Sequence, residues 1–241
     1  MNHINIFHTP LELAKEVARL IQQKANEKAA SNEQLYVAIS GGNTPKLLFE
    51  LLAEEYNTSI PWNNIQFYWV DERCVPPENE ESNYGVANDI LFNQIEIEES
   101  QIERIKGEND SGEEALRYSG ILSSQLPLEN GIPSFDLILL GMGDDGHTAS
   151  IFPNQLELIK SENFCEVGTH PTSGQKRVTL TTKVINNAVA TIFLVTGKNK
   201  AEIIKEIITK KGNYTKYPAA NVKPHNGNLV WMLDKEASML L

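Results

Sequence analysis

The chain has 241 residues, of which 41% are hydrophobic and 22% are charged, a balance typical of a globular protein with a large core. With 21 Lys and Arg against 32 Asp and Glu the formal net charge is −11, which argues against a general binder of nucleic acids or anionic membranes. The two cysteines form no CxxC pair, the N-terminus lacks a signal-peptide pattern, and no apolar run approaches the roughly 20 residues of a membrane helix.

The first elements follow from helix-start signals and short apolar runs. Thr9 supplies a hydroxyl N-cap, Pro10 suits the first helical position and Glu12 the third, and apolar residues recur at helical spacing to about Ala29. Residues 94–112 are acidic and polar, which indicates a loop. In chain order, this half predicts a helix over 9–29, a strand over 35–39, a helix from Thr44-Pro45, a strand over 65–70, a helix over 82–93 and a helix over 113–126.

The second half continues the alternation of strands and helices. A near-continuous apolar run over 135–140 is typical of a parallel strand that is covered on both faces. The rest of the sequence predicts strands over 177–181, 191–195 and 229–233, a helix over 201–208 and a short helix in the tail. We therefore expect a layered α/β fold with a mainly parallel sheet, in one cytoplasmic domain that spans residues 1–241.

Three of the predicted strands end in polar residues that could do chemistry. These strand ends are Ser40 to Thr44, Asp71 to Arg73, and Gly141 to Ser150. Ligands bind beyond the carboxyl ends of strands in open α/β sheets. If the strands are parallel neighbours, the three segments converge on one crevice.

The segment SGGNTP, residues 40–45, suits a phosphate. Gly41 and Gly42 let the backbone approach a ligand closely, and Thr44-Pro45 starts a helix whose free N–H groups attract anions. Ser40 and Asn43 add polar side chains to the same turn. An ordinary strand-to-helix turn explains the glycines equally well, and the motif is neither GxGxxG nor a Walker loop.

The segment WVDER, residues 69–73, offers a carboxylate and a guanidinium. Arg73 is suited to bind a phosphate or carboxylate, or to stabilise an oxyanion. Asp71 is suited to orient a base or to act as one. Taken alone, a structural ion pair at the strand end is the favoured reading.

The segment GMGDDGHTAS, residues 141–150, is the strongest local signal. His147 follows a run of glycines and is suited to take a proton from water near neutral pH. A histidine that binds a loop carbonyl is the alternative, but the glycines favour a functional role. Gly143, Asp145 and Gly146 of the same loop are therefore candidates for binding the ligand.

Other chemistries find less support. His147 has no second histidine three or four residues away and the cysteines are isolated, which argues against a metal site. A serine hydrolase is weakly supported because there is no GxSxG elbow, although Ser40 or Ser150 could approach His147. Three cations lie near the ends of predicted strands, and solvent-exposed charge is the alternative for each of them: Arg177, Lys198 and, with less support, Lys223.

Taken in order, these motifs resemble those of the 6-phosphogluconolactonase family over residues 35–241. The matching segments are SGGNTP, WVDERCVP…SN, DLILLGMGDDGHTASIFP, RVTLT, VTGKNKA and PAANVKPHNGNLVWMLD. The resemblance implies a three-layer α/β/α fold of the type shared by glucosamine-6-phosphate deaminase and ribose-5-phosphate isomerase. It also implies hydrolysis of 6-phospho-D-glucono-1,5-lactone in the pentose phosphate pathway, without a metal or organic cofactor.

The resemblance also implies roles for single residues. His147 would be the general base that activates water, with Asp71 and Arg73 beside the lactone. The turn from Ser40 to Thr44, together with Arg177 and Lys198, would hold the phosphate. Asn43 departs from the family pattern, in which serine is common, so the detail of that contact is open. The expected partner is a phosphosugar lactone, and the expected assembly is a monomer or small homo-oligomer.

Two other functions fit parts of the pattern. In deaminases that resemble this chain, a glutamate shortly after the DGH stretch assists ring opening and a tyrosine follows the DE pair. Here no carboxylate follows His147 until Glu157, and Arg73 stands in place of the tyrosine. The second alternative is a sugar-phosphate sensor without catalysis, but the acidic chain has no basic helix-turn-helix segment.

Overall fold

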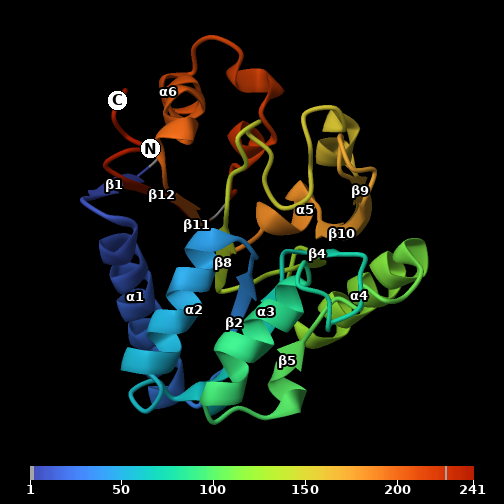
Figure 1. Ribbon diagram of the computed structural model, residues 1–241. Helices are drawn as coiled ribbons and strands as arrows, with labels where there is room; N and C mark the ends of the chain where they lie inside the picture. Colours follow the sequence, from blue (N-terminus) through green and yellow to red (C-terminus); the bar gives the residue numbers. More distant parts are fainter. Residues whose placement is uncertain (1–2, 226) are drawn as a thin grey trace.

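A computed structural model describes residues 3–225 and 227–241, and it is built around one parallel sheet (Figure 1). The strand order is β1-β12-β11-β8-β2-β3-β5, and all six neighbouring pairs are parallel. These strands span His3–Phe7 (β1), Leu35–Ile39 (β2), Ile65–Trp69 (β3), Ile102–Glu103 (β5), Leu137–Leu140 (β8), Ala190–Val195 (β11) and Asn228–Asp234 (β12). The mainly parallel sheet expected from the sequence is confirmed.

Helices cover both faces of this sheet, which confirms the three-layer α/β/α arrangement. The connections through α1, α2 and α3 lead across the sheet in one direction, and those through α4, α5 and α6 lead back. Right-handed crossovers therefore place the two groups on opposite faces. The helices span Pro10–Ala30 (α1), Asn43–Glu55 (α2), Asn83–Ile90 (α3), Ser111–Gln125 (α4), Thr182–Ile185 (α5) and Ala201–Thr209 (α6). Within the described residues, no helix is both long and apolar enough to cross a membrane.

A second, antiparallel sheet stands beside the carboxyl edge of the first. It consists of β4 (Asp71–Arg73), β10 (Lys176–Leu180) and β9 (Cys165–Thr169), in the order β4-β10-β9. The chain passes from β3 into β4 across Val70, whose N–H donates to the carbonyl of Ile39 at 2.9 Å. A short hairpin of β6 (Leu128–Glu129) and β7 (Ile132–Pro133) completes the strands.

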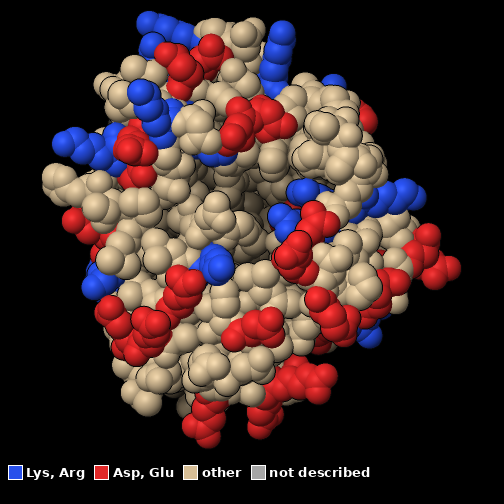
Figure 2. Space-filling view, in the orientation of Figure 1, with Lys and Arg blue, Asp and Glu red and all other residues tan. Residues whose placement is uncertain are grey.

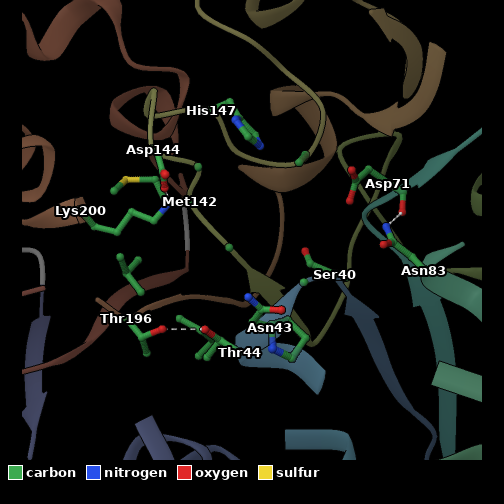
Figure 3. A pocket seen from close by; sticks show the side chains of 18 of the residues that line it. Ser40, Asn43, Thr44, Asp71, Asn83, Met142, Asp144, His147, Thr196 and Lys200 are labelled. Atoms are coloured by element: carbon green, nitrogen blue, oxygen red, sulfur yellow. Dashed lines mark hydrogen bonds and ion pairs between the residues drawn. The ribbon is translucent and has the colours of Figure 1, made fainter. Parts of the chain in front are cut away.

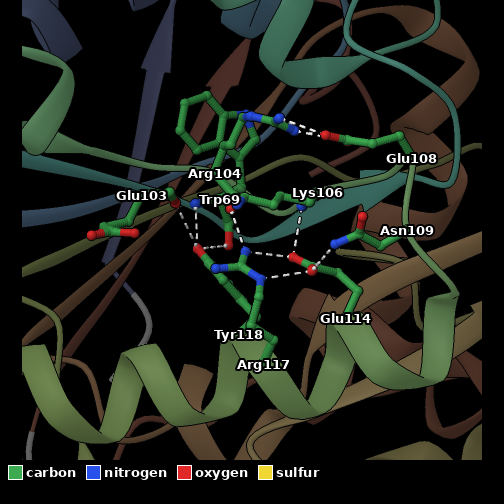
Figure 4. Close-up of polar contacts among 9 residues, drawn as sticks. All are labelled: Trp69, Glu103, Arg104, Lys106, Glu108, Asn109, Glu114, Arg117 and Tyr118. Carbon is green, nitrogen blue, oxygen red and sulfur yellow. Dashed lines mark hydrogen bonds and ion pairs between the residues drawn. The ribbon is translucent and has the colours of Figure 1, made fainter.

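The helix α4 is anchored to the segment that follows β5 by a buried carboxylate (Figure 4). Glu114 is 1% exposed, and its side chain accepts hydrogen bonds from the Lys106 N–H at 2.6 Å and the Asn109 amide at 3.2 Å. Arg117 donates from Nε and Nη2 to the same carboxylate at 2.7 and 2.6 Å. Because every oxygen of the buried charge is bonded, the segment at 103–109 is held in place at the edge of the sheet.

The structure corrects several expectations at the edges. The tail is not helical, because the bonds from Met239 to Glu236 and from Leu241 to Ser238 close three-residue turns. The predicted loop over 94–112 contains β5, whose two paired residues are too few to produce a periodic pattern. The helix predicted over 82–93 ends at Ile90 and gives way to a 3₁₀ turn. The edge strand β1 and the strand β9 were not expected from the sequence.

Candidate functional site

A cavity of about 450 Å³ opens at the carboxyl edge of the parallel sheet. Figure 2 shows it as a hollow in the centre of this face, with basic side chains at its edge. Its walls come from the segments after β2, β8 and β11 and from β4, α3 and β10. The segments that the sequence singled out therefore converge, as the parallel arrangement of the strands requires.

Most of the predicted site residues line this cavity. The residues that do so are Ser40, Gly41, Gly42, Asn43, Thr44, Asp71, Arg73, Gly143, His147 and Arg177. Asp145, Gly146, Lys198 and Lys223 do not line it. The cavity is also lined by residues that sequence reasoning missed: Asn83, Met142, Asp144, Thr196, Asn199 and Lys200.

The start of α2 forms one end of the cavity. Gly42 adopts φ +109°, which favours glycine, and no side chain of the described residues caps the helix. A Cβ on Gly41 would lie 1.7 Å from Oδ1 of Asn83, so a larger residue at position 41 would force the Asn83 side chain to move. The first N–H groups of α2 are thus left for a ligand, which is the arrangement that binds anions at helix N-termini.

The loop after β8 presents the imidazole of His147 to the cavity. Nδ1 lies 2.6 Å from Oδ1 of Asp145, and the backbone N–H of His147 donates to the same oxygen at 3.0 Å. When Nδ1 donates its proton to this carboxylate, Nε2 keeps a lone pair that can accept a proton. Figure 3 shows the ring across the cavity from Ser40 and Asn43.

Electrostatics and packing hold the histidine loop in this form. Burial alone would raise the pKa of Asp145, but hydrogen bonds from the His147 ring and backbone outweigh it and lower the pKa. A Cβ on Gly143 would lie 2.1 Å from Nδ1 of His147, and a Cβ on Gly146 would lie 2.5 Å from Tyr217. Gly143 and Gly146 therefore leave room for the His147 ring and for Tyr217, and Asp145, which does not line the cavity, holds the ring.

The side chains of the segment from Asp71 to Arg73 point in two directions, toward the cavity and away from it. Side chains alternate along a strand, so Asp71 and Arg73 share the face that lines the cavity. Glu72 points the other way and accepts hydrogen bonds from the N–H groups of Arg73, Asn83 and Tyr84 at 2.7, 2.8 and 2.8 Å. Burial raises the pKa of Glu72 against these bonds. Glu72 thus fixes the start of α3, including the cavity residue Asn83.

The buried carboxylate of Asp71 has a serine as its partner. Ser150 Oγ donates to Asp71 Oδ2 at 2.6 Å, and Ser40 Oγ donates to the Leu139 carbonyl at 2.8 Å. Both serines that could have formed a triad with His147 are therefore engaged with other groups. This geometry gives no support to a serine hydrolase.

Two arginines form the wall of the cavity on the side of the antiparallel sheet. Arg73 and Arg177 are directly opposite each other in the register of β4 and β10. Burial, followed by the charge of Arg73, lowers the pKa of Arg177. Nε of Arg73 is buried and has no hydrogen-bond partner among the described residues. Two neighbouring cations with an unused donor favour an anionic group between them.

A third cation enters from the segment after β11. Lys198 is exposed and points away, whereas the Lys200 side chain is 14% exposed and lines the cavity. A 3₁₀ turn over Lys198–Lys200 separates the directions of the two lysines. The sequence indicated the segment but not the residue, because Lys198 and Lys200, three and five positions after the strand, both fit a cation near a strand end.

Comparison with known proteins places the chain among sugar-phosphate enzymes. The family model described as glucosamine-6-phosphate isomerases/6-phosphogluconolactonase matches residues 8–231. The chain is 46% identical to the 6-phosphogluconolactonase of Haemophilus influenzae over 211 residues, which cover 87% of this chain and 89% of that one. It is 37% identical to the 6-phosphogluconolactonase of Treponema pallidum over 226 residues, or 94% and 89% of the two chains.

Solved structures agree with the sequence relatives. The crystal structure of a devB protein is 42% identical, with a TM-score of 0.94 over 99% of both chains. The 6-phosphogluconolactonase of Trypanosoma brucei is 28% identical, with a TM-score of 0.87 over 100% of this chain and 99% of that one. A monomeric glucosamine-6-phosphate deaminase, at 22% identity and a TM-score of 0.81, shares the fold.

Proposed function

Because the chain belongs to the family of glucosamine-6-phosphate isomerases and 6-phosphogluconolactonases, we propose that it hydrolyses 6-phospho-D-glucono-1,5-lactone to 6-phospho-D-gluconate. The observation that carries the proposal is the His147–Asp145 pair at a cavity with cationic groups at two ends. The substrate has a phosphate at one end and an ester carbonyl at the other, so both ends find a complementary group.

The phosphate end of the substrate fits the start of α2. The free N–H groups after Gly42 and the ammonium of Lys200 face the cavity from neighbouring segments, and Thr44 Oγ1 and Thr196 Oγ1 lie 2.9 Å apart between them. In this proposal Lys200 takes the role that the sequence suggested for Lys198. Binding the phosphate far from the reacting carbon fixes the orientation of the ester.

The ester carbonyl then lies within reach of His147. Nε2 takes a proton from a water molecule as the water oxygen attacks C1 of the lactone, and Asp145 stabilises the imidazolium that forms. The tetrahedral intermediate collapses by breaking the bond between C1 and the ring oxygen. The imidazolium returns its proton to that oxygen, so that a carboxylic acid and a hydroxyl group result, and the acid loses its proton to solvent.

The arginine wall stabilises the charge that this reaction develops. Arg73 and Arg177 lie where a negative charge on the former carbonyl oxygen, and afterwards on the product carboxylate, needs donors. Asp71 keeps Oδ2 on Ser150, and we assign its other oxygen to a sugar hydroxyl. An activated ester needs only this modest set of groups.

The deaminase alternative lacks its carboxylate. Thr148, Ala149 and Ser150 follow His147, and the exposed Glu157 does not line the cavity. Asp71 and Asp144 are the carboxylates that line it, and neither belongs to the segment just after His147. We therefore favour ester hydrolysis over ring opening of an amino sugar.

A direct assay tests the proposal. The lactone is generated freshly, the acid released is followed, and spontaneous opening is subtracted. We expect enzyme-dependent turnover that is lost in a folded His147→Ala variant, and no ammonia from glucosamine 6-phosphate. Ammonia release would favour the deaminase, and phosphosugar binding without turnover of either compound would favour a sensor. The cytoplasmic location and the small assembly stay predictions, to be checked by fractionation and by light scattering.

A further inference from the structure

Asp144 is paired with the ammonium of Lys200, the lysine that lines the cavity. The Asp144 carboxylate forms an ion pair with Lys200, and the amide of Asn199 donates to the same carboxylate oxygen at 2.8 Å. All three residues line the cavity. Figure 3 shows Asp144 and Lys200 on the side of the cavity opposite Asp71 and Asn83. The ammonium of Lys200, which the phosphate would need as a partner, is thus already paired with a carboxylate.

The two members of this pair differ in their environment. The side chain of Lys200 is 14% exposed, whereas that of Asp144 is 68% exposed. Burial lowers the pKa of Lys200, so the ammonium gains from an anionic partner. An exposed carboxylate loses little when it returns to water, because surface ion pairs contribute little. Asp144 can therefore leave the pair and be replaced by another anion, while Lys200 stays in place.

The backbone allows this exchange without a change of fold. Asp144 occupies a tight turn in which the N–H of Gly146 donates to the carbonyl of Gly143 at 3.0 Å. Asp144 is the second residue of that turn and its side chain is 68% exposed, so a change of rotamer would take the carboxylate into solvent, away from Lys200. His147 is held by Asp145, the next residue, so its orientation does not depend on Asp144.

We propose that Asp144 determines substrate affinity: it occupies Lys200 when the cavity is empty, and the phosphate group of the substrate displaces it. This inference rests on the proposed phosphate end of the cavity. The acid competes with the ligand for one ammonium, so it weakens the binding of a phosphate ester and leaves the chemical step unchanged. In return, the buried ammonium has a partner when no ligand is bound.

The test is the substitution Asp144→Asn, which removes the charge and keeps the shape. We expect KM for the lactone and the dissociation constants of inorganic phosphate and 6-phosphogluconate to fall by roughly three- to tenfold, with kcat changed less than about twofold. Calorimetry measures the two dissociation constants without turnover. An unchanged or weaker affinity in the variant overturns the proposal, and so does a failure of both proteins to bind either anion.

Two further variants separate the ion pair from a general effect of charge. Glu80→Gln makes the same change in net charge at an exposed residue that does not line the cavity, and is expected to leave the dissociation constants unchanged. In a Lys200→Met background, Asp144→Asn is expected to lose its effect on 6-phosphogluconate binding. If the tightening persists without Lys200, Asp144 acts through the field of the cavity and the proposal is wrong.

The binding measurements also separate this inference from the proposed function. A wild-type protein that binds the anions but does not open the lactone contradicts lactone hydrolysis. The comparison of Asp144→Asn with wild type still decides the role of Asp144 in that case. Conversely, if the wild type hydrolyses the lactone and Asp144→Asn binds the anions with unchanged affinity, the proposed function holds and the proposed competition by Asp144 is wrong.

Discussion

Arg73 and Arg177 stand directly opposite each other on β4 and β10, two like charges that a small antiparallel sheet brings to one wall of the cavity. The two charges repel each other when no anion lies between them. Burial is the main cause of the lowered pKa of Arg177, and the charge of Arg73 lowers that pKa further. An anionic transition state relieves the repulsion, so the pair gains most at the moment of reaction.

Removing one member of this pair should slow the chemical step. We expect Arg73→Met to lower kcat by roughly 10²-fold, because a lost oxyanion donor costs about that much. Initial rates on fresh lactone provide the measurement. Arg104→Met is the matched control, since this guanidinium pairs with Glu108 outside the cavity. Equal losses in the two variants would show that the effect is structural.

Acidification should remove activity through the imidazole. Protonation of Nε2 takes away the lone pair that accepts the proton of water, whereas Asp145, whose pKa is held below its ordinary value of 3.8, stays charged while a histidine titrates. We expect kcat/KM to fall on acidification along a single acidic limb. A rate that rises on acidification would rule out His147 as the base.

The same carboxylate should contribute to stability with a defined sign. Because the pKa of Asp145 is lowered in the folded state, its contribution is present above 3.8 and is lost as the pH falls through the lower, folded-state pKa. The difference in Tm between wild type and Asp145→Asn should therefore shrink in strong acid. Calorimetric scans at neutral and acidic pH check this, and a difference that grows on acidification would contradict the sign.

A single methyl group beside the histidine should disable the site. Gly143→Ala places a Cβ 2.1 Å from Nδ1 of His147, so the ring must leave Asp145 or the loop must move. We expect kcat to fall by at least about tenfold, as for other displaced catalytic groups. Gly120→Ala is the control, because its Cβ meets open space on α4. An unchanged rate in Gly143→Ala would mean that the ring position is not critical.

The two lysines after β11 should differ in their contribution to substrate binding. Lys200→Met is expected to raise KM by roughly 10- to 100-fold, the worth of a charge-assisted hydrogen bond to the phosphate. Lys198→Met should leave KM unchanged, since Lys198 is exposed outside the cavity. Steady-state kinetics on both variants decide the assignment, which the reverse ranking would refute.

The buried carboxylate under α4 should matter for stability alone. Glu114→Gln replaces one acceptor oxygen by a donor that faces Lys106 N–H or Arg117, and we expect a loss of about 2–4 kcal/mol in the free energy of unfolding. Its exposed neighbour Glu113→Gln should change that free energy by less than about 1 kcal/mol. Urea unfolding measures both, and equal losses would contradict the role given to Glu114.

The main strands and helices could be predicted because their signals are local. Thr9 does cap α1, with its side chain accepting the N–H of Glu12 at 3.1 Å, and the apolar run before Gly141 does form the buried strand β8. The strands β1, β5 and β9 escaped prediction. They are short or partly exposed, and their pairing with distant segments, such as β3 with β5, supplies most of their order.

In the candidate site, too, some features follow from local sequence and others depend on distant contacts. The amino-acid sequence by itself determined which strand ends carry glycines, acids and a histidine, because these residues must follow a strand to reach the rim of a parallel sheet. Only the tertiary structure decided that Lys200 and not Lys198 faces the cavity, that Ser150 bonds Asp71 and not His147, and that Arg73 meets Arg177. The physical reason is that side-chain direction in a turn, and pairing between segments a hundred residues apart, depend on contacts that no local pattern encodes.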